Sequence, residues 1–147
     1  MATNNSSPPS VYISRRATFC ASHRLHNALL SQEENLAIFG KCNNPNGHGH
    51  NYVLEVTLYG PVNPDTGFVM NVKDLEQIIE ETVLSKLDHK HLNLDVNAFK
   101  DLNPTSENIA IIIWNWIAQR IPFELLYEVK LHETENNMVI YRGNHSR

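Results

Sequence analysis

Two segments of the chain alternate between apolar and polar residues, and this period of two is typical of half-buried strands. In residues 11–23 the apolar side chains mainly occupy odd-numbered positions, and His23 continues that parity. In residues 52–60 they occupy even-numbered positions, a parity that His48 and His50 share from the preceding loop. The pattern therefore predicts two strands whose inward faces each end in histidine.

Three further segments have the features of helices. Spacings of three and four residues between apolar positions predict helices over 72–87 and 105–121, and a capping pattern predicts a short helix over 31–40. Thr105 or Ser106 would cap the last helix. The residues expected to face the core from the two longer helices are Val72, Leu75, Ile78, Ile79, Val83, Leu87, Ile109, Ile112, Ile113, Trp116 and Ile117.

Shorter strands complete the predicted fold. Residues 67–71 are expected to pair with 52–60 as a hairpin, and two more strands are expected on either side of a tight turn at 135–137. Residues 88–104 are expected to be mostly irregular. The order of strand, strand, strand, helix, helix, strand and strand predicts an α+β fold, in which a small, mostly antiparallel sheet carries two helices packed on one face.

Composition narrows the class of protein. The 147 residues are 41% hydrophobic and 19% charged, which suffices for a buried core. We expect residues 1–10 to form a flexible tail and residues 11–147 a single domain. A net charge of −4 gives no general reason to bind nucleic acid, and the longest apolar run, six residues, is too short to cross a membrane. With a polar N-terminus and two cysteines, the chain is expected in a reducing cytoplasm.

Eight histidines are an unusual count, and His48 and His50 flank a glycine. Residues two apart on a strand point the same way, so both imidazoles can converge on one ion, and His23 would supply a third ligand from the other strand. Three histidines with one open position are typical of catalytic zinc, although imidazole also suits copper, iron and nickel. The alternative is that the pair only forms hydrogen bonds within a loop. The histidines expected at the surface are His26, His132 and His145.

Candidates for acid–base chemistry lie close to these histidines in the sequence. Cys42 lies six residues before His48, and a nearby metal cation would favour its thiolate form; the alternative is an inert residue in a loop. Asp88 and His89 are adjacent and could form an acid–base pair. Neighbouring side chains often diverge, however, and His91 offers a competing pair of metal ligands with His89.

Glu133 is an unusual carboxylate because it continues the apolar parity of the strand before the 135–137 turn. A buried charge must be paired or hydrogen-bonded, and no Lys or Arg occupies a matching position in the sequence. A ligand with an edge of N–H donors would satisfy this carboxylate. The alternative is a solvated strand end.

These segments together resemble the 6-pyruvoyl-tetrahydropterin synthase family of zinc enzymes. The similarity runs from about Val11 to Gly143 and is most specific in FGKCNNPNGHGHNY at 39–52, where Cys, five residues and His-Gly-His follow one another. The other segments that carry it are FCASHRL (19–25), LDHKHLN (87–93), PTSEN (104–108) and HETENN (132–137).

The resemblance implies a role for each candidate residue. The ligands of one Zn²⁺ per subunit would be His23, His48 and His50; the catalytic residues would be Cys42, as the general base, with Asp88 and His89; and the residues that bind the pterin would be Glu133 and Thr105. It further implies a tunnelling fold, in which three subunits close their sheets into a barrel and two trimers stack as a homohexamer. Active sites would then form at subunit interfaces, with Asp88 and His89 supplied by a neighbouring subunit.

The reaction implied by the resemblance is that of a phosphorus–oxygen lyase in tetrahydrobiopterin biosynthesis. It converts 7,8-dihydroneopterin triphosphate into 6-pyruvoyl-tetrahydropterin and inorganic triphosphate. The alternatives are 6-carboxy-tetrahydropterin synthase activity on the same substrate, a zinc hydrolase, and a non-catalytic zinc- or pterin-binding module. The joint presence of Cys42, Asp88 and His89 argues against the module. The cations that would bind the triphosphate stay open among Lys41, Lys90, Arg15 and Arg16.

Overall fold

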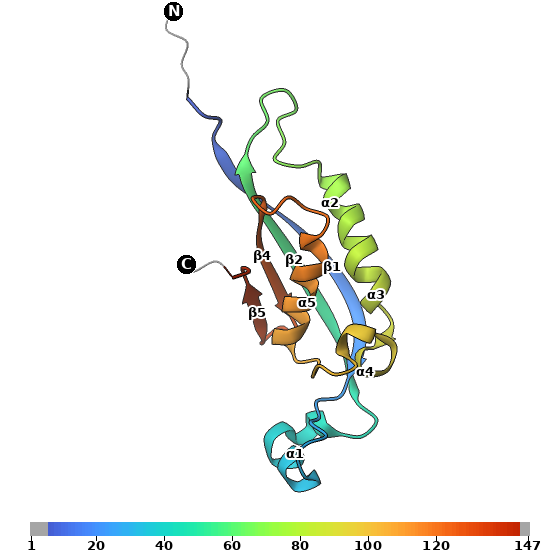
Figure 1. Cartoon of the computed structure of the whole chain (residues 1–147). Helices are drawn as coiled ribbons and strands as arrows, with labels where there is room; N and C mark the ends of the chain where they lie inside the picture. The colour runs from blue at the N-terminus through green and yellow to red at the C-terminus, as the bar shows by residue number, and fades with distance from the viewer. Residues whose placement is uncertain (1–5, 145–147) are drawn as a thin grey trace, which may run out of the picture.

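The structure is a computed structural model that describes residues 6–144. Within these residues one sheet has the strand order β3-β1-β2-β4-β5 (Figure 1). The strands are β1 (Ser10–His23), β2 (His48–Pro61), β3 (Lys90–His91), β4 (Leu126–His132) and β5 (Met138–Tyr141). The helical elements are α1 (Gln32–Phe39), η1 (Gly40–Asn43), α2 (Val72–Ile79), η2 (Glu80–Leu84), α3 (Ser85–Leu87), α4 (Leu92–Asp95), η3 (Asn97–Phe99) and α5 (Ser106–Ala118). The predicted α+β class is confirmed.

The long antiparallel pair of β1 and β2 forms the centre of the sheet. It begins with Ser10 opposite Pro61 and ends with His23 opposite His48. Because side chains alternate between the two faces of a strand, the even-numbered residues of β2 all face the core, where Leu54 is fully buried. The predicted strands over 11–23 and 52–60 are confirmed, and β2 reaches back to include both histidines of the His-Gly-His sequence.

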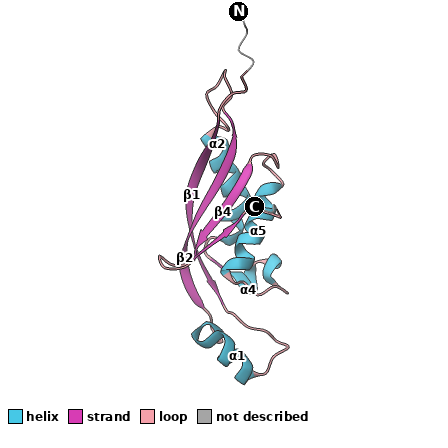
Figure 2. Ribbon diagram, turned by 90° about the vertical axis from the view of Figure 1, so that its left-hand side faces the viewer, coloured by secondary structure: helices cyan, strands magenta, loops and turns pink. Residues whose placement is uncertain are grey.

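The helices cover one face of the sheet, as predicted (Figure 2). Helix α2 packs against β1, and α5 packs against β4 and β5. Ile109, Ile113 and Ile117 of α5 are completely buried in the resulting core. Helix α1 lies at the far end of the molecule from the N-terminus and begins as predicted, since Ser31 Oγ accepts a hydrogen bond from the backbone N–H of Glu34. The core therefore ends where the histidine-bearing ends of β1 and β2 emerge towards α1.

The predicted strand at 67–71 is wrong, because these residues form a loop. Asn63 organises the start of this loop: its side-chain oxygen accepts hydrogen bonds from the backbone N–H groups of Asp65 and Thr66. A hairpin with β2 has no free edge to use, since β2 pairs with β1 on one side and β4 on the other.

The helix predicted over 72–87 is one helical run that widens into the π-helical turn η2 in its middle. The inward positions differ from the prediction at its start, where Val72 is 46% exposed in the first turn after the Asn71 cap. In α5 the buried aromatic residue is Trp114, which packs edge-on against Tyr141. Ile112 and Trp116, predicted to face the core, are only half-buried.

Two features of the sheet differ from the simple periodic pattern. The two-residue strand β3 pairs in parallel with β1 inside the segment expected to be irregular. The pairing of β2 with β4 shifts register between Thr57 and Leu58, so that Leu126 lies opposite Leu58 and Glu128 opposite Thr57. The odd-numbered parity predicted for β4 therefore holds only from Val129 onward, and Glu128 is buried before it.

The ends of the chain are described only in part. Of the predicted tail, residues 1–5 lie outside the described residues, residues 6–9 are exposed, and Ser10 already belongs to β1. His145 also lies outside the described residues, whereas His26 and His132 are half-buried and not fully at the surface. Between residues 6 and 144 no helix has the length and apolar character needed to cross a membrane. Closure of three sheets into a barrel stays a prediction.

Candidate metal and substrate site

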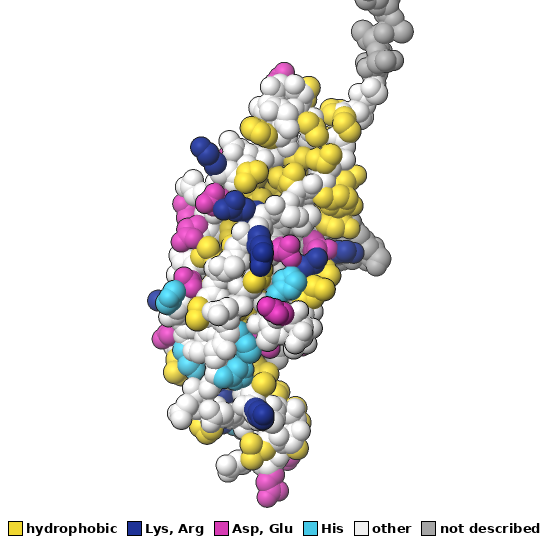
Figure 3. Space-filling model, turned by 180° about the vertical axis from the view of Figure 1, so that it is seen from behind, with side chains coloured by type: hydrophobic (Ala, Val, Ile, Leu, Met, Phe, Trp, Pro, Cys, Tyr) yellow, Lys and Arg dark blue, Asp and Glu magenta, His cyan; other side chains and the backbone are white. Residues whose placement is uncertain are grey.

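The ends of β1 and β2 bring His23, His48 and His50 together, as the strand parity predicts. The ligand atoms of the three side chains all lie within 4.8 Å of one another, and the Nε2 atoms of His23 and His48 are 3.2 Å apart. At zinc–nitrogen distances of about 2.0–2.1 Å, two ligands of one tetrahedral ion lie roughly 3.3–3.4 Å apart. The cluster is thus close to the spacing that a single ion requires. Figure 3 shows histidine side chains gathered towards the α1 end of the molecule.

The hydrogen bond of His23 to Pro104 leaves the lone pair on Nε2, the ring nitrogen that faces His48. The Nδ1 atom of His23 lies 2.7 Å from the backbone oxygen of Pro104. A carbonyl oxygen can only accept, so Nδ1 carries the proton and Nε2 keeps its lone pair. Burial lowers the pKa of His23, and the hydrogen bond to Pro104 opposes that effect only in part. The neutral ring is the form that binds a metal ion.

His50 shows the need for a ligand most directly. Its Nε2 is buried and has no hydrogen-bond partner within residues 6–144. Burial lowers the pKa of His50, although the nearby Glu133 carboxylate acts in the opposite direction. Buried polar atoms are nearly always satisfied, and a metal ion held with His23 and His48 would satisfy this one. The donor set therefore fits Zn²⁺ or another divalent ion that prefers imidazole.

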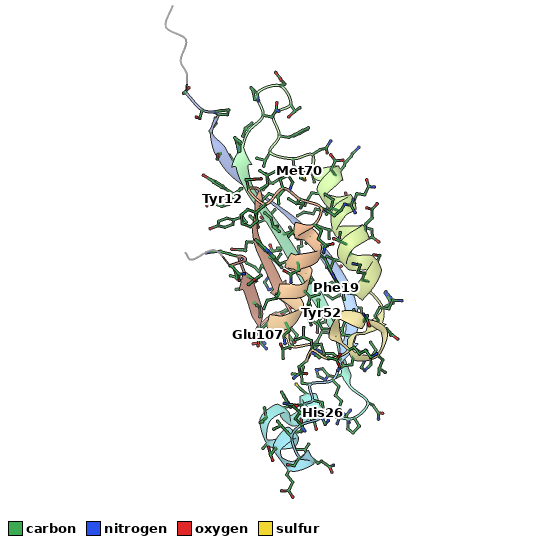
Figure 4. All side chains as sticks on the ribbon, in the orientation of Figure 1. Tyr12, Phe19, His26, Tyr52, Met70 and Glu107 are labelled. Carbon is green, nitrogen blue, oxygen red and sulfur yellow. The ribbon has the colours of Figure 1, made fainter. Side chains whose placement is uncertain are left out.

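Tyr52 packs beneath the histidines and closes the cluster against the core. Its ring stacks on Phe19 at a centroid distance of 4.9 Å, and its hydroxyl lies 3.5 Å from His23 Nδ1 (Figure 4). The residue has no exposed surface, and burial raises the pKa of its hydroxyl. Tyr52 therefore stays neutral and restricts how the histidine rings can move.

Glu133 lies directly after β4 and its carboxylate reaches the histidine cluster at His50. One of its oxygens, Oε2, accepts a hydrogen bond of 2.5 Å from Ser106 Oγ, and Oε1 lies 3.7 Å from His50 Nε2. Within residues 6–144 its ion pair is with this histidine and not with a Lys or Arg. The structure thus gives Glu133 no stronger cation, as the sequence indicates, and leaves acceptor capacity for a ligand.

A surface pocket of about 500 Å³ lies beside Glu133 and the start of α5. Thr105 and Ser106 line it, together with Glu107, which Figure 4 labels at the beginning of that helix. Thr105 Oγ1 accepts the capping hydrogen bond from Asn108 N–H, whereas Ser106 bonds to Glu133. The sequence does not predict the bond from Ser106 to Glu133. The signal that could have found it is the pair of adjacent hydroxyls at the helix start, because only one of them is needed for the cap.

Asp88 and His89 contact each other, which sequence adjacency alone does not guarantee. Asp88 Oδ1 lies 3.0 Å from His89 Nδ1 and accepts a hydrogen bond from the backbone N–H of Cys20. That backbone hydrogen bond is the main reason why the pKa of Asp88 is lowered. Cys20 precedes His23 by three residues, so the pair lies roughly 10 Å along β1 from that histidine. It lies just before β3, which pairs with β1 on the side away from β2. The His89 side chain is 82% exposed there.

The remaining candidates differ in how the structure places them. Cys42 lies in η1, with a half-buried free thiol, and its backbone oxygen accepts a hydrogen bond from Leu25 N–H near the end of β1. No contact joins its sulfur to the histidines within the described residues, so its catalytic role stays a prediction. His91 belongs to no three-ligand cluster among residues 6–144, which leaves the competing pair with His89 without support.

Comparisons with known proteins all point to one family. A family model described as 6-pyruvoyl tetrahydropterin synthase matches residues 12–144. The human 6-pyruvoyl tetrahydrobiopterin synthase is 53% identical over 131 residues, covering 89% of this chain and 90% of that protein. The Dictyostelium discoideum protein of the same name is 50% identical over 133 residues, covering 90% and 96%. The solved structure of Caenorhabditis elegans 6-pyruvoyl tetrahydropterin synthase has a TM-score of 0.90 and 41% identity, covering 95% of this chain and 99% of that one.

Proposed function

The chain belongs to the 6-pyruvoyl tetrahydropterin synthase family, and we propose that it converts 7,8-dihydroneopterin triphosphate into 6-pyruvoyl-tetrahydropterin with elimination of triphosphate. This is a phosphorus–oxygen lyase reaction of tetrahydrobiopterin biosynthesis, carried out in the cytoplasm. The observation that carries the proposal is the convergence of three imidazoles beside the carboxylate of Glu133. A metal site and a carboxylate acceptor for N–H groups, side by side, are what a pterin substrate with a polar side chain requires.

The three histidines would hold one Zn²⁺ per subunit. When bound, zinc would act as a Lewis acid that acidifies C–H groups next to the side-chain oxygens of the substrate. His23 is oriented for this by Pro104, and His50 has a buried nitrogen in need of a partner. Both rings are held neutral by burial, which suits them to metal binding.

Glu133 would anchor the pterin ring. An ionised carboxylate only accepts hydrogen bonds, and the amino group and ring N–H of a pterin form a matching edge of donors. Ser106 already donates to one oxygen and so fixes the direction of the carboxylate. Thr105 lines the same pocket, where its hydroxyl proton is free to contact the ligand while its oxygen caps α5.

Proton transfer would require two subunits. The Cys42 thiolate would remove a proton from the side chain of the substrate, and the Asp88–His89 pair would return one. The exposed position of His89 just before β3 is suited to reaching a neighbouring subunit. We therefore include in the proposal a homohexamer, built as a dimer of trimers, with active sites at the subunit interfaces.

The reaction is tested by incubating zinc-loaded protein with 7,8-dihydroneopterin triphosphate and identifying the product by mass. The expected products are 6-pyruvoyl-tetrahydropterin and inorganic triphosphate. Formation of 6-carboxy-tetrahydropterin would contradict the proposed activity, and recovery of unchanged substrate would indicate a binding module. Hydrolysis of simple esters without any change in the pterin would indicate a zinc hydrolase.

The shared active site is tested by mixing two inactive variants. Cys42→Ala and His89→Ala subunits, dissociated and reassembled together, should regain activity, because some interfaces then combine an intact Cys42 with an intact His89. Each variant reassembled alone serves as the control. Failure of the mixture to exceed those controls, with hexamers verified by light scattering, would contradict the placement of the two residues on different subunits.

A further inference from the structure

A second pocket, of about 510 Å³, lies between α1, η1 and the segment that follows β1. Its charged and ionisable lining consists of Arg24, His26 and Lys41, and no Asp or Glu contributes to it. Figure 4 labels His26 at this junction, between the body of the molecule and α1. A concentration of cationic side chains without carboxylates is notable in a protein whose net charge is −4.

The buried residue Asn43 holds the side chains of Arg24 and His26 in place. It is 3% exposed, and its Nδ2 donates to the backbone oxygen of Leu25 and to His26 Nδ1. The carbonyl of Leu25 can only accept, so the amide orientation is fixed and His26 Nδ1 must act as an acceptor. In the neutral ring the proton then lies on Nε2, which becomes a donor. The backbone oxygen of Asn43 also accepts from Arg24 Nε.

The remaining cationic donors in this pocket have no partners among the described residues. Within residues 6–144, the terminal nitrogens of Arg24 and the exposed ammonium group of Lys41 form no ion pair or hydrogen bond. Together with His26 Nε2–H they form a group of donors, of which Arg24 and His26 are held by Asn43. Such a group suits an anion with several oxygens, because guanidinium and ammonium groups bind phosphate oxygens well.

Four other pockets are electrostatically less suitable for a polyphosphate. The pocket beside Glu133 also includes Glu107, and a pocket lined by His50 includes three glutamates with the single arginine Arg16. The pocket over Arg15 and Arg16 contains three glutamates. A pocket next to α4 shares Arg24 and His26 with the pocket between α1 and η1 but places Asp101 beside Lys100. Carboxylates would repel a triphosphate, so the pocket of Arg24 and Lys41 is the better site for one.

The backbone links this pocket directly to the metal and catalytic residues. Arg24 follows the metal-ligand candidate His23, and Lys41 precedes Cys42. The hydrogen bond from Leu25 N–H to the oxygen of Cys42 ties these two segments together. An anion held here would therefore lie next to segments that also shape the proposed active site.

We propose that Arg24, His26 and Lys41 form a polyphosphate-binding pocket that takes the triphosphate tail of the substrate. The assignment to the tail rests on the proposed function, whereas the affinity for a polyphosphate does not. Of the four cations that the sequence leaves open for this role, the pocket selects Lys41 and adds Arg24, which no sequence pattern indicates.

Affinity for the anion is tested with inorganic triphosphate and zinc-loaded protein by isothermal titration calorimetry. Lys41→Gln should weaken binding about threefold to fivefold, as expected for an exposed charge. Adding Arg24→Gln, whose amide can still donate to Asn43, should raise the loss to about tenfold or more. Lys41→Arg should restore affinity, and Lys73→Gln on α2 should leave it unchanged. Absence of binding to the unaltered protein, or equal losses in the Lys41→Gln and Lys73→Gln variants, would overturn the proposal.

The source of the polyphosphate is tested by steady-state kinetics on the same variants. If the pocket takes the tail, Lys41→Gln should raise the KM for 7,8-dihydroneopterin triphosphate while its zinc content and its affinity for 7,8-dihydroneopterin, which lacks the tail, stay unchanged. An unchanged KM with weakened binding of inorganic triphosphate would overturn the tail assignment and indicate a site for a free polyphosphate. If the protein forms no product but binds triphosphate through Lys41, the proposed function fails and the pocket stands.

Discussion

The inward side chains at the two ends of β2 lie on one face of the sheet, yet they are held in place by different interactions. At one end Leu54, Val56 and Leu58 have no exposed surface and pack against the helices. At the other end His48 and His50 occupy the same parity, but their surroundings come from loops and strand ends. The comparison shows that a single period-two pattern can position both a core and a candidate metal site.

The difference between these ends lies in what each side chain needs. An apolar side chain is satisfied by any well-packed neighbour, whereas an imidazole needs a specific donor, acceptor or ion. The histidine end therefore depends on Pro104, Ser106 and Glu133, which come from distant parts of the sequence. Substitutions at the apolar end should change stability, and those at the histidine end should change metal content or chemistry.

The substitution expected to distinguish the histidine end of β2 from its apolar end most strongly is His48→Ala. Removal of one of three ligands should reduce the zinc content to background and abolish product formation together, because two imidazoles hold the ion too weakly. Elemental analysis and the product assay measure both effects. Asn51→Ala, an exposed position on the opposite face of the same strand, is the matched control and should retain zinc. Full zinc occupancy in His48→Ala would remove this residue from the metal site.

Cys42→Ala should separate chemistry from metal binding. A positioned acid–base group typically contributes about 10²–10⁴-fold, so turnover should fall by that factor while the zinc content stays at one per subunit. Cys20→Ala removes the other, exposed thiol and should keep wild-type turnover. Equal turnover in the two variants would exclude Cys42 as the base.

Leu54→Ala tests the apolar end. Truncation of a fully buried leucine costs about 2–5 kcal/mol, from lost burial and the cavity left behind. The free energy of unfolding, measured with urea, should fall by this amount, while the folded variant still binds zinc. Leu29→Ala, at a position that is 94% exposed, should change stability by less than about 0.5 kcal/mol. Loss of zinc from folded Leu54→Ala would show that the two ends are not independent.

Glu133→Gln should produce the smallest of these effects. A neutral amide presents a donor where the pterin edge requires an acceptor, so pterin affinity should fall by about tenfold to a hundredfold with the zinc content unchanged. Glu135→Gln, an exposed position two residues further along, provides the control. Wild-type pterin affinity in Glu133→Gln, measured by equilibrium binding, would contradict the anchor role.

The parts of the fold that follow a local period were predictable from the sequence. Strands β1 and β2, the capped starts of α1 and α5 and the burial of Ile113 all follow from alternation, helical spacing or capping chemistry. The strand expected at 67–71 fails because pairing depends on which edges of the sheet are free. Strand β3 is too short to show any period, and the register shift near Leu58 changes the faces of β4 in a way that only the partner strand determines.

The residues of the candidate site likewise divide into those that a local sequence pattern predicts and those that it does not. The three histidines were predictable because strand parity places them on one face, and Glu133 because it interrupts an apolar series. The carbonyl of Pro104 and the hydroxyl of Ser106 were not, since each acts through contacts across more than twenty residues of sequence. Arg24 and His26 were missed for a similar reason: the buried amide of Asn43 brings their donors together, and no local pattern shows this.

The central claim is that His23, His48 and His50 together bind one divalent ion. Anomalous diffraction on both sides of the zinc absorption edge, from crystals grown with zinc, tests it most directly. The account predicts a single strong peak at about 2.0–2.1 Å from one nitrogen of each of the three rings. Rings that point apart with no peak between them, in crystals soaked with excess zinc, would contradict it.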